Sequence, residues 1–404
     1  MVDIKNIQFV DTILVFIDWY LPGTNAGGPV RSVANVVDHL GGEFHFSIIT
    51  RNNDYCSMEP YPGIAPDGWT ALNDHTRVCY LSPGKVSCQN LRKLIRDTSF
   101  DVAWINGIYS WSFSILPLFL LKRSRKRIVV SSRGMMNRQA FTSGKLKKKF
   151  FITLARWSGL YKGVKFHATN EDEKKNILQQ LGKDAQVIVA PNLPTKLSRK
   201  SEESSKEYEV GREGNLQSDK QKSPGSLKLL SIARISPEKG TLHALHLLKG
   251  FKKGNIQFDL YGPVYNESYW EACREVIASL PSNVTFAWHG PAGGEQIRKA
   301  LSDAHFLLML SEGENFGHSI LEALSEGVPV IISDRTPWRN LEDKKAGFDL
   351  PLEDRPAFVR TLDRALAMDG SEWQEWSAGA SALAFEYADN ESNVEASRKM
   401  LSEK

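Results

Sequence analysis

Short apolar runs alternate along the chain with segments whose apolar positions recur every three to four residues. The short runs predict buried β-strands, and the periodic segments predict amphipathic helices. This alternation is typical of βαβ units and parallel sheets. In the first half we expect strands at 13–18, 44–49, 102–105, 128–131, 165–168 and 186–190. We expect helices between them at about 30–39, 90–97, 114–123, 145–157 and 172–180.

The pattern breaks at residues 195–226, where Ser, Lys, Glu and Gly dominate, as in a flexible linker. A second series follows, with strands expected at 227–233, 256–261, 284–288, 306–310 and 328–333. Its helices are expected at about 241–250, 268–280, 294–302, 318–327 and 372–401. We therefore predict an α/β protein of two doubly wound, Rossmann-like domains facing a cleft, at 1–194 and 227–404. The terminal helix, about 381–404, is a candidate for packing back on the first domain.

Composition fits this fold class. The chain has 404 residues, of which 41% are hydrophobic and 24% charged, enough apolar side chains for two cores. Four scattered cysteines without a CxxC pair indicate neither a zinc site nor a disulfide framework. The N-terminus lacks the features of a signal peptide. The longest apolar run, 113–121, falls short of the roughly 20 residues that span a bilayer. We expect a cytoplasmic protein, free or attached to a membrane surface.

Positive charge is concentrated in the first half. Residues 91–170 contain 17 Lys and Arg against 2 Asp and Glu, although the net charge of the chain is only +4. Two basic runs, 122–127 and 145–149, stand out, and Phe150 and Phe151 follow the second. A solvated helix face is the usual explanation. The excess also suits an anionic membrane, held by largely electrostatic attachment that 1 M salt releases.

Two cations follow the first strand of the second half. Arg234 and Lys239 are five residues apart, and Gly240 comes next, in a turn that opens a helix. A guanidinium, an ammonium and helix-terminal N–H groups together suit a diphosphate. Alone, the same residues also fit an ordinary solvated turn.

A second candidate loop follows the strand expected at 306–310. Glu314 and Glu322 are eight residues apart, on either side of a helix start at Gly317. Gly317 allows close backbone approach to a phosphate or sugar hydroxyl, and the carboxylate of Glu322 suits a vicinal diol. A single glutamate here would fit a helix N-terminus or a surface position. The remaining candidate sugar contacts of the loop are Asn315, Phe316 and His318.

These spacings resemble the signature of glycosyltransferase family 4, whose members are retaining, use nucleotide-sugars and have the GT-B fold. The matching donor-side elements are Arg234…Lys239-Gly240, Glu314-x7-Glu322 and Gly327-Val328-Pro329-Val330-Ile331. Looser acceptor-side matches are Gly27-Gly28-Pro29, Asn106-Gly107-Ile108, Ser131-Ser132-Arg133-Gly134 and His167-Ala168-Thr169. With Arg133 in the third of these, the chain resembles a subset of the family that makes bacterial surface polysaccharides.

The resemblance implies roles for the donor-side residues. Arg234 and Lys239 would hold the donor diphosphate, Glu322 the ribose, and Glu314 the transferred sugar near its reacting carbon. The acceptor would be a glycan carried on a polyprenyl diphosphate. The resemblance implies same-face attack, in which the leaving phosphate takes the acceptor proton. No loop carries the Asp-x-Asp pair that would chelate a divalent ion, so we expect no metal and no cofactor beyond the sugar nucleotide.

Two acceptor-side residues depart from the family pattern. Arg133 and Asn106 stand where many members carry histidine. Arginine stays protonated and cannot act as a base, so Arg133 either stabilises charge on the departing phosphate or binds acceptor. Gly28 is a candidate for backbone contact with phosphate, although a flexible loop explains it equally well. For Trp338, stacking on a ligand and buried packing both stay open.

Other function classes fit less well. A nicotinamide-dependent oxidoreductase would carry GxGxxG after a strand, and a P-loop NTPase GxxxxGK[ST]; neither motif is present. A nucleic-acid binder is disfavoured, because no reading motif is recognisable and the two glutamates would repel phosphates. A glycan phosphorylase or an inactive glycosyltransferase-like subunit stays open.

Overall fold

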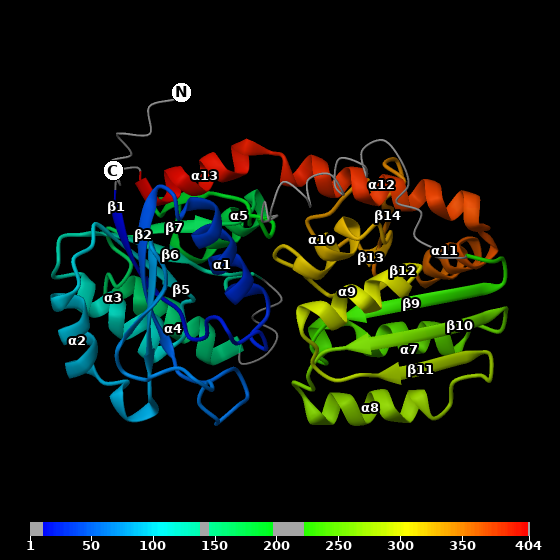
Figure 1. The fold of residues 1–404 in the computed structure, drawn as a ribbon, viewed down its shortest axis with the longest axis horizontal. Helices are drawn as coiled ribbons and strands as arrows, with labels where there is room; N and C mark the ends of the chain where they lie inside the picture. The colour runs from blue at the N-terminus through cyan, green and yellow to red at the C-terminus, as the bar shows by residue number, and fades with distance from the viewer. Residues whose placement is uncertain (1–10, 138–144, 197–221, 403–404) are drawn as a thin grey trace. The chain divides into compact units, whose positions relative to one another are not determined.

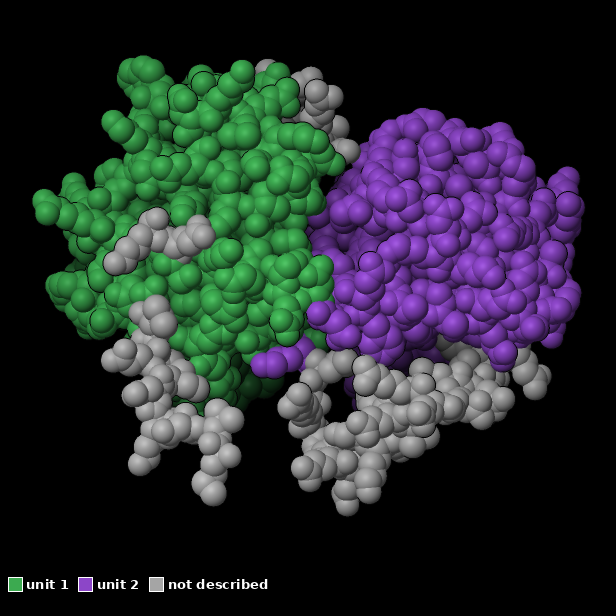
Figure 2. All heavy atoms as spheres, turned by 90° about the horizontal axis from the view of Figure 1, so that it is seen from above, with its two compact units in different colours: residues 1–195, 390–404 green, residues 196–389 purple. Residues whose placement is uncertain are grey.

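The computed structural model describes residues 11–137, 145–196 and 222–402. The chain divides into two compact units, residues 1–195 with 390–404, and residues 196–389 (Figure 2). Most of the linker expected at 195–226 lies outside the described residues. Each unit contains a parallel sheet covered by helices on both faces, which confirms the predicted α/β class (Figure 1).

The sheet of the first unit has eight strands in the order β3-β4-β2-β1-β5-β6-β7-β8. All neighbours are parallel except the antiparallel pair β3 and β4. The chain winds outward in both directions from β1, so its switch point lies between β1 and β5. The strands are β1 Asp11–Phe16, β2 Phe44–Arg51, β3 Trp69–Asn73, β4 Thr76–Leu81, β5 Val102–Asn106, β6 Arg127–Ser131, β7 Lys165–Ala168 and β8 Gln186–Val189.

Of the helices in the described residues, two cover one face of this sheet and four cover the other. Buried side chains of α1 and α13 form one core cluster with the strands, and those of α2 to α5 form a second. The helices are α1 Gly28–Leu40, α2 Cys88–Asp97, α3 Leu116–Leu121, α4 Lys145–Trp157, α5 Glu171–Leu181 and α13 Glu391–Ser402. Although α13 is the last helix of the chain, it packs against α1, and Arg398 bonds Glu43.

The sheet of the second unit has six parallel strands in the order β11-β10-β9-β12-β13-β14. The strands are β9 Ser226–Ile232, β10 Asn255–Tyr261, β11 Val284–Trp288, β12 Phe306–Met309, β13 Val330–Ser333 and β14 Gly347–Leu350. The helices are α7 Thr241–Lys249, α8 Glu267–Ile277, α9 Gly294–Asp303, α10 His318–Ser325, α11 Arg355–Ala367 and α12 Gly370–Ala388. Here the switch point lies between β9 and β12.

Four of the described elements were not predicted from the sequence, and one predicted helix is divided in two. The strands β3, β4 and β14 and the helix α11 were not predicted. Strand β3 is mostly exposed, so it carries no apolar run, and β14 begins with Gly347 and contains Asp349, so its apolar run is broken. The single helix expected at 372–401 is two helices, because the side chain of Asn390 accepts from the backbone N–H of Ser392 and caps a new start.

Among the described residues, no helix combines the length and apolar content needed to cross a bilayer.

Candidate functional site

The two predicted donor-side loops lie at the switch point of the second unit. Strand β9 pairs with β10 on one side and β12 on the other. The loop after β9 carries Arg234 and Lys239, and the loop after β12 carries Glu314. Because carboxyl ends of parallel strands share one edge of the sheet, the loops meet where doubly wound folds bind ligands.

Backbone contacts lock the two loops together. Gly240 has φ +69°, and a Cβ atom there would lie 1.8 Å from the carbonyl oxygen of Leu310. The N–H of Glu312 donates to the carbonyl of Glu238 at 2.9 Å. Only glycine allows this approach, so Gly240 fixes the position of its neighbour Lys239 against the second loop.

Lys239 and Glu314 form the closest ion pair of the site. The ammonium nitrogen lies 2.5 Å from Oε1 of Glu314, and the hydroxyl of Ser311 donates to the same oxygen at 2.9 Å. The side chains are only 20% and 9% exposed. The residue predicted to bind the diphosphate, Lys239, and the residue predicted to bind the sugar, Glu314, are therefore neighbours. They lie in a partly desolvated site, where charge interactions are strong.

Arg234 is held within its own loop. Its guanidinium pairs with Glu238 at 3.0 Å and lies over the ring of Tyr265, 4.9 Å from the centroid. Burial alone would raise the pKa of the Glu238 carboxyl, but hydrogen bonding and Arg234 lower it below its ordinary value. In the described part of the chain Arg234 makes no hydrogen bond to Glu314, so its guanidinium is not part of the pair of Lys239 and Glu314.

The start of α10 positions the remaining donor-side candidates. Gly317 has φ +82° and precedes the first helical residue, His318. This left-handed backbone favours glycine, and a Cβ atom at Gly317 would also lie 2.7 Å from Cδ1 of Ile320, whose side chain would have to shift. Glu322 lies one turn into α10, and the side chains of Asn315, His318 and Glu322 are all half-buried. Their ligand roles stay predictions.

The ring of Phe316 belongs to the core. It packs against Trp338 at 5.8 Å and Tyr387 at 5.5 Å between ring centroids. Trp338 is 7% exposed, and its indole N–H donates to the carbonyl of Phe316 at 2.7 Å. Of the two interpretations of Trp338, buried packing is therefore correct. Because the ring of Phe316 is buried, only its backbone is left for the predicted contact with the sugar.

Arg133 lies at the carboxyl end of β6 in the first unit, in a left-handed conformation with φ +52°. Its Nε and Nη2 donate to Oδ1 of Asn106, the latter at 2.6 Å, and its Nη1 donates to Oδ1 of Asn192 at 3.1 Å. Burial lowers the pKa of Arg133 to about 10, so the cation persists at neutral pH. The guanidinium is clamped by neutral amides and directly paired with no carboxylate in the described structure.

Glu173 on α5 holds the loop of Arg133 in place. Its Oε1 accepts from the hydroxyl of Ser132 at 2.5 Å and the N–H of Gly134 at 2.7 Å. Its Oε2 accepts from the N–H and the hydroxyl of Thr169, both at 2.8 Å. Burial would raise the pKa of this carboxyl, but the hydrogen bonds lower it. Sequence analysis missed Glu173, although Asn170-x-x-Glu173 has the spacing of a helix capping box.

His167 is part of the same buried network. The indole N–H of Trp104 donates to Oγ of Ser131, which lies 2.7 Å from Nδ1 of His167. Nε2 of His167 lies 2.8 Å from the carbonyl of Ala190, which can only accept. The directions fit one tautomer: His167 is neutral, with its proton on Nε2. Burial, and then Arg133, lower its pKa to about 4.

Gly28 is the first residue of α1. Gly27 before it has φ +70°, and Pro29 is the second residue of the helix. Nothing lies within 4 Å of a Cβ atom built on Gly27. The contact of Gly28 with phosphate stays a prediction.

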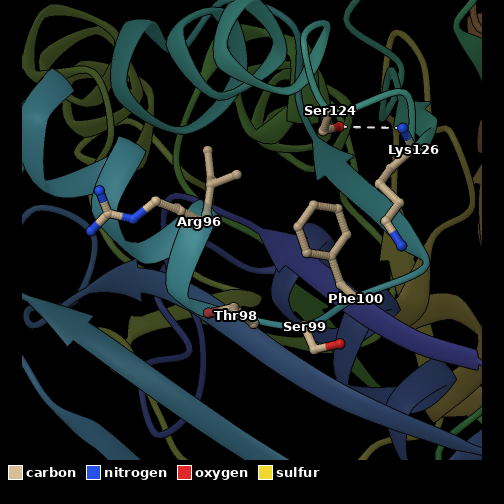
Figure 3. A pocket seen from close by; sticks show the side chains of 7 residues that line it. Arg96, Thr98, Ser99, Phe100, Ser124 and Lys126 are labelled. Carbon is tan, nitrogen blue, oxygen red and sulfur yellow. Dashed lines mark hydrogen bonds between the residues drawn. The ribbon is translucent and has the colours of Figure 1, made fainter.

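A pocket of about 280 Å³ in the first unit lies apart from these residues (Figure 3). Its lining residues precede β5 and β6, at the amino ends of the strands, and include Arg96, Phe100 and Lys126. The candidate residues Asn106 and Arg133 follow the carboxyl ends of the same strands. The pocket is therefore no part of the candidate site.

Comparison with known families matches residues 214–380 to the model of "Glycosyl transferases group 1". The second unit therefore carries a glycosyltransferase domain. The matched segment contains both donor-side loops, so the predicted enzyme class is confirmed. A search of curated proteins found no match.

Solved structures support the fold along nearly the whole length of the chain. Sucrose-phosphate synthase from Thermosynechococcus elongatus has 16% identity and a TM-score of 0.68, and 96% of this chain and 97% of that one are covered. Anabaena HepE, in complex with UDP-glucose, has 15% identity, TM-score 0.68, and coverage of 98% and 100%. WaaG, a glycosyltransferase involved in lipopolysaccharide biosynthesis, has 13% identity, TM-score 0.61, and coverage of 97% and 100%. The GT-B fold is thereby confirmed.

Proposed function

We propose that this glycosyltransferase is a retaining hexosyltransferase of family 4. It moves a sugar from a nucleotide-diphosphate donor to a hydroxyl of a glycan acceptor, carried on a lipid, in cell-surface polysaccharide synthesis. The observation that carries the proposal is the contact between Lys239 and Glu314. It places a cation suited to binding a diphosphate beside a carboxylate suited to binding sugar hydroxyls. That HepE was crystallised with UDP-glucose and that WaaG is involved in lipopolysaccharide biosynthesis support this direction.

Donor binding follows from the donor-side loops. Arg234, Lys239 and the backbone N–H of Gly317 would stabilise the diphosphate, with Gly28 of the first unit as a further phosphate contact. Glu322 would accept hydrogen bonds from the ribose hydroxyls. Asn315, His318 and the backbone of Phe316 would contact the transferred sugar. Glu314, kept in position by Lys239 and Ser311, would bind that sugar near its reacting carbon.

In the proposed reaction the bond between the anomeric carbon and the diphosphate breaks as the acceptor hydroxyl attacks the same face. The departing phosphate takes the hydroxyl proton, so no protein base is needed. Cations at fixed positions stabilise the charge that develops on the leaving group. Arg133 is suited either to stabilising this charge or to binding the acceptor, because Asn106 and Asn192 hold its guanidinium in place. We propose no metal requirement.

The decisive experiment measures nucleotide release from UDP-, GDP-, dTDP- and ADP-sugars. We expect one donor to be hydrolysed, and Lys239→Ala to abolish most of that hydrolysis. EDTA should leave the rate unchanged, and NMR of a transfer product should show the donor's anomeric configuration. Absence of hydrolysis with every donor would contradict an active transferase, and inversion would contradict the retaining mechanism.

A further inference from the structure

Helix α4 of the first unit has an apolar face without a partner in the described structure. Phe150, Leu154 and Trp157 are 72%, 48% and 87% exposed. Their spacing of four and three residues aligns them along one side of the helix. The opposite side is buried through Ile152 and Ala155. Single exposed apolar residues are common on soluble proteins, but three in a row on a helix that is already anchored indicate a contact surface.

Cations border this apolar stripe. At 100° per residue, Lys147 falls on one side of it, and Lys149 and Arg156 fall on the other. All three side chains are exposed. The helix contains no acidic residue, and residues 91–170 contain only 2 against 17 basic ones. Apolar side chains flanked by Lys and Arg suit the interface of an anionic bilayer.

Charge argues against a second copy of the chain as the partner. In a two-fold symmetric dimer the stripe would meet itself, which would bring the three bordering cations of each copy close to like charges. Anionic lipid headgroups satisfy the same cations directly, at about 1 kcal/mol each.

Helix α4 also packs, through Tyr109, against the loops that hold Arg133. The ring of Phe151 packs edge-on against Tyr109, with centroids 5.5 Å apart. Tyr109 follows Asn106 by three residues, and its hydroxyl donates to the carbonyl of Met135, two residues after Arg133. The inner face of α4 therefore supports the predicted acceptor loops, while its outer face is exposed.

We propose that Phe150, Leu154 and Trp157, with Lys147, Lys149 and Arg156, insert the outer face of α4 into the interface of an anionic lipid bilayer. This membrane surface rests on the proposed function, because it would bring a lipid-carried acceptor towards the loop of Arg133. It differs from the electrostatic attachment expected from the sequence. Apolar insertion is insensitive to screening, so part of the binding should persist in 1 M salt.

Co-sedimentation with vesicles tests the surface. We expect the full chain to bind vesicles of phosphatidylcholine with phosphatidylglycerol, and to bind pure phosphatidylcholine weakly. Replacing Lys147, Lys149 and Arg156 with Gln should reduce binding to anionic vesicles about a hundredfold, the equivalent of three charges at about 1 kcal/mol each. Replacing Phe150, Leu154 and Trp157 with Ser should abolish the part that persists in 1 M salt.

Matched variants control for charge and apolar area alone. Arg123, Arg125 and Lys126, changed to Gln, remove three exposed cations from the other basic run. Met58, Leu72 and Phe385, changed to Ser, remove three exposed apolar side chains elsewhere. Both controls should bind vesicles like the wild type, and all variants should keep donor hydrolysis, which separates this test from the proposed function.

Three results would overturn the proposal: wild-type protein that ignores anionic vesicles, α4 variants that bind them normally, or controls that lose binding equally. Light scattering covers the remaining case. A dimer that the Ser variant converts to monomer, without vesicle binding by the wild type, would assign the stripe to a second copy.

Discussion

The ammonium of Lys239 lies 2.5 Å from the carboxylate of Glu314, across 75 residues of sequence. The pairing has a consequence for donor binding. A diphosphate that approaches Lys239 brings a second anion to a cation that Glu314 already neutralises. If Lys239 holds the diphosphate as proposed, the hydrogen bond from Ser311 would keep the carboxylate in place as the ammonium turns towards phosphate. Each partner therefore depends on the other, and removing one leaves a mostly buried charge uncompensated.

Replacement of Lys239 with Ala should therefore be more harmful than replacement of Arg234. We expect Lys239→Ala to lower kcat/KM by the equivalent of about 2–4 kcal/mol, since it removes a fixed donor and exposes the diphosphate to Glu314. Arg234 is more exposed and has other partners, so Arg234→Ala should fall at the lower end. Lys249→Ala, at an exposed position on α7, is the control. Near wild-type transfer by folded Lys239→Ala would refute the diphosphate assignment.

Replacing each of the two glutamates with Ala should change the kinetics in a different way. Glu322→Ala should chiefly raise the donor KM, because a ribose contact is equal in the ground and transition states. Glu314→Ala should chiefly lower kcat, because its proposed contact is near the reacting carbon. Steady-state kinetics with saturating acceptor separates the two effects. The opposite pattern would mean that the roles are exchanged.

Much of this arrangement could be predicted because it is local in sequence. Alternating strands and helices predicted both sheets, and the positions of Arg234, Lys239 and Glu314 just after strands predicted their common edge. The network around Arg133 could not be predicted, because Asn106, Glu173 and Asn192 come from different parts of the chain and meet only through the strand order. Exposure on α4 was equally hard to predict, since Phe150 and Phe151 look alike in sequence, but Phe150 is 72% exposed and the ring of Phe151 packs against Tyr109.

Gly240 should tolerate no side chain. Gly240→Ala adds a Cβ atom 1.8 Å from the carbonyl oxygen of Leu310 and forces the two donor-side loops apart. Gly290→Ala is a matched control, because Gly290 has a similar φ of +73° but nothing within 4 Å of the added atom. The control should lose about 1 kcal/mol of unfolding free energy from backbone strain alone. Gly240→Ala should lose more, together with most donor affinity; equal losses in urea unfolding would contradict the locking role.

Glu173 should act by positioning Arg133 rather than by touching substrate. In Glu173→Gln the amide group can accept at one atom only, so at least one donor among Ser132, Gly134 and Thr169 loses its partner. We expect a loss of about 2–3 kcal/mol in stability and a fall in kcat with little change in donor KM. Glu171→Gln, on the same helical turn but exposed, should change neither. A raised donor KM with unchanged kcat would place Glu173 in donor binding instead.

His167 makes stability depend on pH in the mildly acidic range. An unfolded chain protonates this histidine near pH 6.5, but the folded chain does so only near pH 4. Between these values the unfolded state binds more protons, so lowering the pH destabilises the folded state. The loss amounts to about 2 kcal/mol between pH 6.5 and pH 5. His167→Gln removes the titration, so urea unfolding at the two pH values should show a smaller drop for the variant than for the wild type. Equal drops would mean that His167 is not held neutral by Ser131 and the carbonyl of Ala190.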